Sequence, residues 1–161
     1  MSMIPTRQRG FTLVELIITM VIMAVLAAVA APRFFNSNDF YARGFHDETL
    51  GLLRYAQKAA IAQRRTVCVA FTSTTATLTI ASAASTFDCA TSTPLAGPNG
   101  SPTITARTGV TYNITTPPTD FNFDGLGRPI AVSGAAMATQ NIKIDNASDV
   151  VVEASTGYVH D

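Results

Sequence analysis

The pattern of hydrophobic and polar positions divides the chain into three parts. Residues 11–31 read FTLVELIITMVIMAVLAAVAA, an apolar run interrupted only by two threonines and by Glu15. As a helix this run extends roughly 30 Å, about the thickness of the hydrocarbon core of a membrane. Residues 33–65 carry apolar side chains at helical spacing, and residues 66–161 alternate between apolar and polar positions. We therefore predict a transmembrane helix over residues 11–32, an amphipathic helix and a β-rich domain, in that order.

The second part is expected to start a new helix. Pro32 lacks the N–H that the helical hydrogen-bond ladder requires, so the first helix should end or kink there. Ser37 and the two polar residues after it are typical of a helix start, and the pattern runs to about Arg65. One face of this helix should cover a sheet, and it carries Phe45, Thr49, Leu52, Leu53, Ala56, Ala60 and Gln63.

The third part is expected to form an antiparallel sheet. Two adjacent strands are predicted at residues 66–71 (TVCVAF) and 75–81 (TATLTIA), joined by a threonine-rich turn, and residues 82–102 read as a loop. A later hairpin should turn near Asn146. Further strand candidates are residues 103–107, 109–115, 140–145 and 149–155. A long helix packed on such a sheet is an α+β fold.

Glu15 is unusual because it lies inside the apolar run. A carboxylate at membrane depth costs about 2.5–3.5 kcal/mol even on insertion scales, so by default it marks a function. A cleaved signal peptide is one interpretation, with residues 28–30 (AVA) as the cleavage site, although the length of the run and Glu15 argue against it. A plain single-pass anchor is a second interpretation, and it leaves Glu15 unpaired in lipid.

A third interpretation gives Glu15 a partner. Cleavage between Gly10 and Phe11 would create an α-amine four residues before Glu15, at a helix N-terminus that itself favours a carboxylate. That amine could neutralise Glu15 of the same chain or of a neighbouring chain. Paired buried charges are best attested as devices that set register. On this interpretation, Glu15 acts when the helix packs against copies of itself or of its relatives.

The charges exclude a dedicated nucleic-acid binder but leave a small basic stripe. The chain has 11 basic and 11 acidic residues and no broad basic surface. Arg7 and Arg9 precede the apolar run, so the positive-inside rule sends the C-terminal part across the membrane. Arg54, Lys58 and Arg65 line one side of the second helix. A solvated stripe is the preferred interpretation, and contact with acidic neighbours in a fibre or with DNA is the alternative.

Cys68 and Cys89 are the two cysteines of the sequence. In a chain exported through an inner membrane they most simply form one disulfide bond. Closing that loop would stabilise the domain by roughly 3 kcal/mol in the chain-entropy model. The alternative is a pair of free buried thiols.

Residues 120–125 (DFNFDG) open like a calcium-binding loop, with Asp120, Asn122 and Asp124 as oxygen donors. The twelfth position of such a loop holds Ala131 instead of a bidentate glutamate. The preferred interpretation is therefore a strand that ends in a polar Asp-Gly turn. No catalytic arrangement of nucleophile and base is visible, so we expect neither an enzyme nor a cofactor.

The segment RGFTLVEL, residues 9–16, resembles the class III leader of type IV pilins and type II secretion pseudopilins. The resemblance implies a leader of residues 1–10, cleavage after Gly10 by a prepilin peptidase, methylation of the new Phe11 amine, and pairing between subunits through Glu15. Pro32 also fits this family.

Three later segments strengthen the resemblance to this superfamily. Residues 53–71, 123–129 and 150–160 resemble the soluble domain of the GspH/FimT class of minor pilins, and most closely that of minor pilins of mannose-sensitive haemagglutinin (MSHA) type pili. Members of that class that take up DNA carry an arginine-rich C-terminal motif. Tyr158 and His160 stand at the corresponding place here, which puts DNA capture in doubt.

The sequence therefore predicts a minor pilin or pseudopilin of a type IV pilus or a type II secretion pseudopilus. The expected partners are other pilins, a prepilin peptidase and an inner-membrane assembly platform. Before assembly the chain should cross the bacterial inner membrane once, with its C-terminal domain in the periplasm. Two alternatives stay open, a tip-located module that captures DNA or a surface ligand, and a plain membrane-anchored periplasmic domain.

Overall fold

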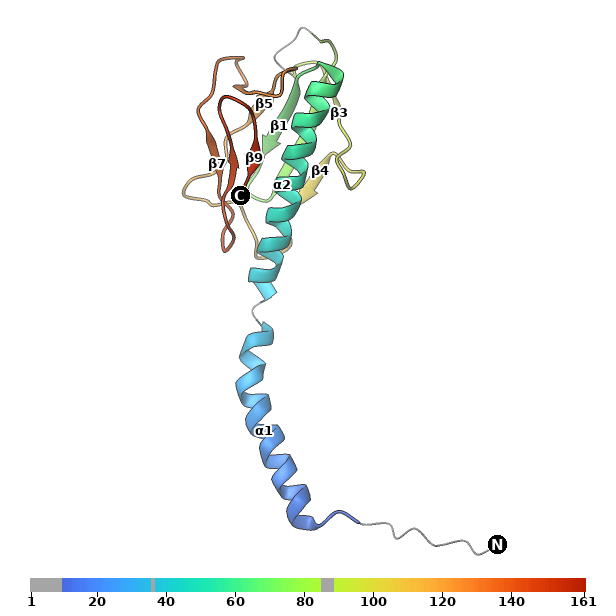
Figure 1. Ribbon diagram of the computed structural model, residues 1–161, viewed down its shortest axis with the longest axis vertical. Helices are drawn as coiled ribbons and strands as arrows, with labels where there is room; N and C mark the ends of the chain where they lie inside the picture. The colour runs from blue at the N-terminus through green and yellow to red at the C-terminus, as the bar shows by residue number, and fades with distance from the viewer. Residues whose placement is uncertain (1–9, 36, 85–88) are drawn as a thin grey trace, which may run out of the picture. The chain divides into compact units, whose positions relative to one another are not determined.

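The computed structural model describes residues 10–35, 37–84 and 89–161, and of residues 30–35 and Ser37 it describes only the backbone. Most of the predicted leader therefore lies outside the described residues. The chain divides into two compact units, Met1–Ser37 and Asn38–Asp161. The first unit contains helix α1 (Leu13–Phe35), whereas the second contains nearly all of helix α2 (Ser37–Gln63) and two antiparallel sheets (Figure 1). This combination of elements confirms the predicted α+β fold.

Helix α1 does not end at Pro32. It continues through the proline to Phe35, so the predicted end at Pro32 was wrong, and the alternative of a kink there stays a prediction. Proline removes its own N–H from the ladder, but the residues after it still have N–H groups to donate, so a helix can extend past the defect.

Helix α2 begins and ends close to the predicted positions. Its inward face follows the predicted spacing, with Phe45, Leu52, Leu53 and Ala56 almost fully buried. Gln63 is exposed, so the buried face ends before the last turn of the helix.

The larger sheet has the order β3-β2-β1-β5-β6, with β4 also paired to β2. The predicted first hairpin is present, because β1 and β2 pair antiparallel from Val67↔Ile80 to Phe71↔Ala76. Thr72 forms its turn, since its hydroxyl accepts a hydrogen bond from Thr75 N at 2.9 Å. The strands of this sheet are β1 (Val67–Phe71), β2 (Thr75–Ala81), β3 (Ser92–Pro94), β4 (Thr103–Thr105), β5 (Phe121–Phe123) and β6 (Pro129–Ala131).

The smaller sheet has the order β7-β8-β9. Its strands are β7 (Gln140–Ile142), β8 (Val150–Val152) and β9 (Val159–His160). The predicted hairpin joins β7 to β8, and Asn146 adopts a φ of 63° in its turn. Asparagine tolerates this left-handed conformation better than most residues, which explains its place at the turn.

Residues 109–115 do not form the predicted strand. Tyr112 makes an isolated bridge to Ile144, but the segment then turns, because the side chain of Asn113 accepts hydrogen bonds from Thr115 N and Thr116 N. A side chain that captures backbone N–H groups in this way competes with strand pairing. Strands β3, β6 and β9 were not predicted.

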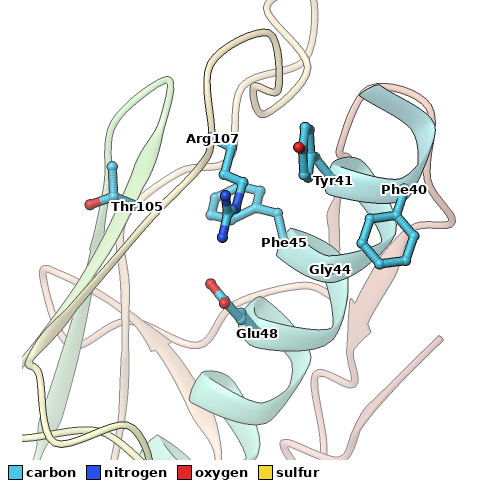
Figure 2. Close-up of a pocket in the computed structure, with 7 residues that line it drawn as sticks. All are labelled: Phe40, Tyr41, Gly44, Phe45, Glu48, Thr105 and Arg107. Atoms are coloured by element: carbon cyan, nitrogen blue, oxygen red, sulfur yellow. The ribbon is translucent and has the colours of Figure 1, made fainter. Parts of the chain in front are cut away.

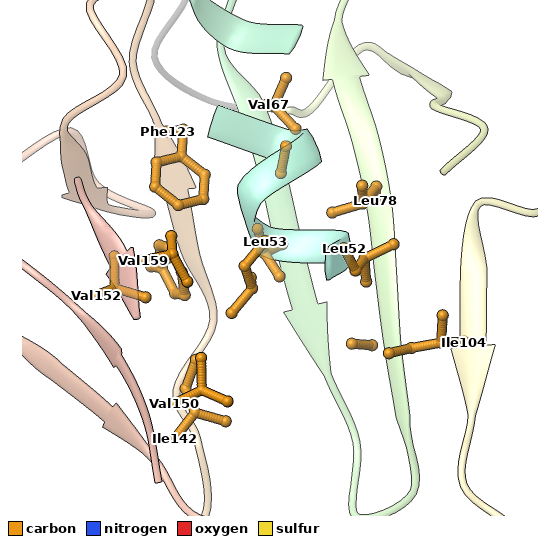
Figure 3. Close-up of a cluster of buried hydrophobic side chains, with 14 of the residues drawn as sticks. Leu52, Leu53, Val67, Leu78, Ile104, Phe123, Ile142, Val150, Val152 and Val159 are labelled. Carbon is orange, nitrogen blue, oxygen red and sulfur yellow. The ribbon is translucent and has the colours of Figure 1, made fainter. Parts of the chain in front are cut away.

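Both sheets pack against α2 and share one core. In Figure 3, Leu52 and Leu53 of the helix lie among side chains from the larger sheet and from the smaller one. The larger sheet contributes Val67, Leu78, Ile104 and Phe123, and the smaller one contributes Ile142, Val150, Val152 and Val159. The helix is therefore the common support of two sheets that have separate strand orders.

Candidate assembly surface

The described large apolar side chains of α1 are all exposed within this chain. Their exposed fractions run from 48% at Leu16 to 76% at Leu13. In the part of the chain that the structure describes, none of the helices has both the length and the apolar character that membrane crossing requires. Exposed apolar side chains of this number favour burial against other apolar surfaces. The other exposed positions on this helix are Val14, Ile17, Ile18, Met20, Val21, Ile22, Met23, Val25, Leu26 and Val29.

The start of α1 brings the predicted processing and assembly residues together. Gly10 and Phe11 precede the helix and are exposed, and Glu15 lies in its first turn. The hydroxyl of Thr12 accepts a hydrogen bond from Glu15 N at 3.2 Å, and the carbonyl of Thr12 accepts one from Leu16 N at 3.2 Å. Thr12 is therefore the N-cap, and the spacing T-x-x-E has the form of a capping box. The T-x-x-E spacing can be recognised in the sequence, but the role predicted for Glu15 was pairing between subunits and not helix capping.

Two of the three residues of the predicted basic stripe donate hydrogen bonds to backbone carbonyls of the β domain. Arg54 Nε donates to the carbonyl of Val159 in β9 at 3.0 Å. The guanidinium of Arg65 donates to the carbonyl of Ala81 at the end of β2. Lys58 is exposed. Arg54 thus connects α2 to the smaller sheet, and Arg65, which follows the end of α2, contacts the larger sheet.

Within the candidate calcium loop, the carboxylates are engaged by the protein. Asp120 Oδ1 accepts from Phe71 N at 2.8 Å, and Asp124 forms an ion pair with Arg128 at 2.8 Å. Asn122 is buried in β5. Among the described residues, no group of three or more His, Cys, Asp or Glu side chains is placed to hold a metal ion. The segment is therefore strand and turn.

Cys68 and Cys89 form a disulfide bond, with their Cα atoms 6.2 Å apart. Cys68 lies in β1, and the bond fastens the loop that leads to β3 to the middle of the larger sheet. The bond therefore belongs to the β domain and does not involve either helix.

His46 connects α2 to the turn of the β7–β8 hairpin. Its Nε2 lies 3.3 Å from the Ser148 hydroxyl and its Nδ1 lies 3.1 Å from Asp47 Oδ1. Sequence reasoning did not anticipate this serine, histidine and aspartate in hydrogen-bond order. The Asp47 side chain is 79% exposed, however, so water screens the carboxylate that would have to stabilise a charged imidazole. We interpret the three residues as a structural contact between α2 and the turn of the β7–β8 hairpin.

Tyr112 provides a polar contact inside the core. Its hydroxyl lies 3.1 Å from Thr49 Oγ1, which itself donates to the Phe45 carbonyl at 2.8 Å. Burial raises the pKa of the Tyr112 hydroxyl well above its usual value, while the hydrogen bond with Thr49 acts in the opposite direction. The tyrosine therefore remains a neutral donor.

Two glycine-containing loops meet at Gln57. Its Nε2 donates to the carbonyls of Gly127, at 3.2 Å, and Thr156, at 2.9 Å. A Cβ on Gly157, which has a φ of +67°, would collide with the Gly127 carbonyl. These loops fall within two of the segments that carry the GspH/FimT resemblance, so their glycines have a packing role.

The C-terminal hairpin carries an aromatic pair in place of the arginine-rich motif. The rings of Tyr158 and His160 stack with centroids 5.2 Å apart, and His160 Nε2 lies 3.2 Å from Glu153 Oε1. The hydrogen bond with Glu153 is the main reason that the pKa of His160 is raised above 6.5.

A cavity of about 540 Å³ opens beside the first turns of α2 (Figure 2). We call it the aromatic pocket. The Arg107 guanidinium lies over the Tyr41 ring, 5.2 Å from its centroid, and Phe40 is 77% exposed at one side. The residues that line the pocket are Phe40, Tyr41, Gly44, Phe45, Glu48, Thr105 and Arg107.

Comparison with known proteins finds a family match in the N-terminal segment. Residues 5–31 match the family model described as the prokaryotic N-terminal methylation motif, which includes Gly10, Phe11 and Glu15. This match agrees with the predicted resemblance of the N-terminal segment to the pilin superfamily.

A particular relative agrees with this class. Over 59 residues the chain is 39% identical to the type IV narrow pilus major component PilA5 of Thermus thermophilus, and the match covers 37% of this chain. The matched region is 51% of PilA5, so the chain spans about half the length of the curated relative it matches. No solved structure matches the chain significantly.

Proposed function

We propose that this protein is a structural, non-enzymatic subunit that assembles with other pilins into a type IV pilus or a type II secretion pseudopilus. The observation that carries the proposal is the set of exposed apolar side chains on α1, a helix that begins at Leu13, shortly after the predicted cleavage site. Burying one Leu, Ile or Val side chain contributes about 1.5–3 kcal/mol. Packing of α1 among the helices of neighbouring subunits would bury many such side chains at once.

The same proposal gives roles to Gly10 and Phe11. Gly10 lies outside the helix and is exposed, and among the described residues nothing apart from its chain neighbours lies within 4 Å of the position that a Cβ would occupy there, which supports access of a peptidase to the bond to Phe11. Cleavage after Gly10 leaves the methylated amine of Phe11 just before the helix. That amine supplies the positive charge that Glu15 lacks.

Glu15 is proposed to pair with the Phe11 amine of a neighbouring subunit. In an isolated chain, a glutamate at this position of a capping box can turn back toward the backbone N–H of Thr12. Assembly would replace that local contact by a charged pair between chains, and a charged pair sets the register of the helices.

We propose that the precursor is held in the inner membrane by α1, with residues 38–161 on the periplasmic side. A prepilin peptidase then processes it and an assembly platform extracts it into the fibre. The class of minor pilin, and the MSHA type in particular, are supported by the resemblance of residues 53–71, 123–129 and 150–160 to that class.

A tip-located module that captures DNA is not favoured by the contacts in the domain. Arg54 and Arg65 donate to backbone carbonyls, and Glu153 and Asp161 lie near the stacked Tyr158 and His160. Phosphate binding requires cationic side chains that can contact phosphates and so release counterions. The guanidinium groups of Arg54 and Arg65 are instead engaged by the protein's own backbone.

The N-terminus of protein recovered from its native membrane and fibre fractions tests the proposal. Intact-mass and N-terminal analysis should find a chain that starts at methylated Phe11. A chain that starts at Met1 would indicate a plain anchor, and one that starts near residue 31 would indicate a signal peptide. Either result would overturn the fibre-subunit proposal.

Replacement of Glu15 by leucine tests the pairing step separately. Glu15→Leu should be processed normally but recovered in fibres at about a tenth of the normal level or less, because the Phe11 amine then stays unpaired and a lone charge at membrane depth costs about 2.5–3.5 kcal/mol. Thr19→Val is the matched control, since it also removes a polar interruption of the apolar run. Normal recovery of Glu15→Leu would remove the pairing role.

A further inference from the structure

Asn99 combines a side-chain amide with a glycine as its next residue. It is the only asparagine of the sequence that a glycine follows. The backbone nitrogen of the next residue can attack the side-chain carbonyl carbon of an asparagine and close a succinimide ring. A side chain on that next residue hinders the attack, whereas glycine has no Cβ that could do so. Because both reacting groups belong to one chain, the reaction avoids the entropy cost of bringing two molecules together.

The structure places Asn99 in an exposed turn between β3 and β4. Asn99 and Gly100 are both exposed, and Gly100 has a φ of +81°. Gly97 N donates to the Ser101 carbonyl at 2.7 Å, and Gly100 N donates to the Gly97 carbonyl at 3.0 Å. Residues 97–101 belong to no strand, so the turn can open locally while the sheet stays folded.

The side-chain carbonyl of Asn99 is polarised by its neighbour. Its Oδ1 accepts a hydrogen bond from Ser101 N at 3.0 Å. Attack at the carbonyl carbon places negative charge on this oxygen, and a donor directed at the oxygen stabilises that charge. The hydrogen bond from Gly100 N to the Gly97 carbonyl acts in the opposite direction, because it must break before the nitrogen attacks. Local opening of the turn is therefore the step that allows the reaction.

We propose that Asn99 is a site of spontaneous covalent modification. Once the turn opens, Gly100 N forms a bond to Asn99 Cγ, and the side-chain amide leaves as ammonia, which takes up the proton that Gly100 N loses. Water then opens the succinimide at either carbonyl carbon and leaves aspartate or isoaspartate. Water is the only co-reactant. The inference goes beyond the proposed function and does not depend on it.

The product would change a cavity of about 310 Å³ beside the turn. Pro98 and Asn99 line this cavity from the turn, and Asp47, Glu48 and Leu52 line it from α2. Conversion replaces a neutral amide by a carboxylate in a cavity that already has two, and like charges repel. Isoaspartate also inserts one more carbon into the main chain, so the hydrogen bonds across the turn lose their spacing. We therefore expect the modified turn to open more readily.

Ageing of the purified full-length chain in detergent at neutral pH tests the proposal. Samples taken over time are digested at acidic pH, and peptide mass spectrometry measures the conversion of Asn99 and of Asn146. Asn146 is the internal control, because it is also exposed in a turn but is followed by Ala147. Asn99 should be lost at least about tenfold faster, which corresponds to an activation barrier lower by about 1.4 kcal/mol. Equal loss at the two asparagines would overturn the inference.

The chemical form of the product identifies the mechanism. Isoaspartate arises only through the ring, whereas direct hydrolysis of the amide gives aspartate alone. Incubation in water enriched in heavy oxygen should label the product at Asn99, which separates conversion during the incubation from conversion before or after it. A product without isoaspartate, or without the label, would overturn the inference.

Gly100→Ala tests the role of the residue that supplies the nitrogen. No atom lies within 4 Å of the position of the new Cβ, so the turn has room for it. The variant should lose Asn99 about tenfold more slowly, because the Cβ hinders the attack and so raises the barrier. Alanine is strained at a φ of +81°, and this strain favours opening of the turn and faster loss. Unchanged or faster loss in the variant would overturn the inference.

Hydrogen exchange measures the effect on the turn. The amide of Gly97 should exchange faster in the aged chain than in the fresh chain, because it donates to the carbonyl on the other side of Asn99. Asn99→Asp in a fresh chain supplies the new charge without the inserted carbon, so it should show a smaller increase. Unchanged exchange in a chain that contains isoaspartate would overturn the proposed loosening of the turn.

Discussion

Helices α1 and α2 are similar in length, 23 and 27 residues, but they differ in where their partners are. Leu53 of α2 is 0% exposed, because two sheets of the same chain cover it, whereas Leu16 of α1 is 48% exposed. The chain itself therefore covers the apolar face of α2, whereas it leaves the apolar side chains of α1 exposed. Under the proposed function, α1 would contact lipid first and the helices of other subunits afterwards.

The hydrogen bonds of the two helices show the same difference. The side-chain hydrogen bonds of Thr12 and Thr19 in and before α1 reach three residues along the chain. By contrast, Arg54 and Gln57 of α2 reach carbonyls about 70 to 105 residues away. Substitutions in α2 should therefore change the stability of the domain, and substitutions in α1 should change assembly.

Gly157→Ala should have the largest effect on the domain. The new Cβ would collide with the Gly127 carbonyl, and alanine would also be strained at a φ of +67°. Strain and overpacking together should lower the free energy of unfolding by about 3–5 kcal/mol. Denaturant unfolding followed by circular dichroism measures the change. Gly100→Ala is the control, because its φ is +81° but no atom lies within 4 Å, so about 1–2 kcal/mol is expected.

Leu53→Ala and Leu16→Ala test the comparison between the helices directly. Removing the buried Leu53 side chain should lower the free energy of unfolding of the domain by about 3 kcal/mol. Leu16→Ala should change it by less than about 0.5 kcal/mol, because that side chain has no partner in the chain. Both are read from the same denaturant curve. A large effect of Leu16→Ala on unfolding would show that α1 is part of the folded domain after all.

Thr12→Ala should weaken the first turn of α1. Loss of the N-cap costs about 1 kcal/mol, so the amide of Glu15 should exchange with solvent about fivefold faster. Hydrogen exchange of the full-length chain in detergent measures this change. Thr19→Ala, which removes a hydroxyl bond to the Leu16 carbonyl within the helix, should leave the exchange of the Glu15 amide unchanged.

His160 should show the smallest effect, as a shift in its titration. Glu153 holds the pKa of His160 above 6.5, so the folded state binds this proton more tightly than the unfolded state. The resulting stabilisation is fully present below pH 6.5 and is lost as the pH rises through the folded-state pKa. Glu153→Gln should return the pKa toward 6.5 in an NMR titration, and Glu48→Gln should not. No shift with Glu153→Gln would mean that the contact is absent in solution.

Elements with a long, regular pattern were predictable from the sequence. The alternation in TVCVAF and TATLTIA predicts β1 and β2 to within a residue, and the helical spacing predicts α2. Residues 109–115 show the limit of such patterns, since they look like a strand but the Asn113 side chain takes the backbone N–H groups that a strand would share. Local hydrogen bonding of this kind has no periodic signature.

The candidate site was predictable only in part. RGFTLVEL identifies Gly10, Phe11 and Glu15 without a structure, because charge, glycine and carboxylate stand at fixed spacing. The aromatic pocket could not be predicted, since Arg107 and Glu48 are 59 positions apart and only the fold brings them together. The hydrogen bond from Arg54 to the Val159 carbonyl could not be predicted for the same reason, because the two residues are far apart in the sequence.

The two hydrogen bonds of Gln57 have a consequence for how the sequence can change. One amide group holds the β5–β6 turn of the larger sheet and the β8–β9 turn of the smaller sheet at once. An insertion in either turn would move a carbonyl out of reach of that amide and leave the other turn with a changed partner. The two loops therefore do not tolerate length changes independently, although 29 residues separate Gly127 from Thr156 in the chain. Because Gln57 contacts both turns, a change in the length of one turn would require a compensating change in the other.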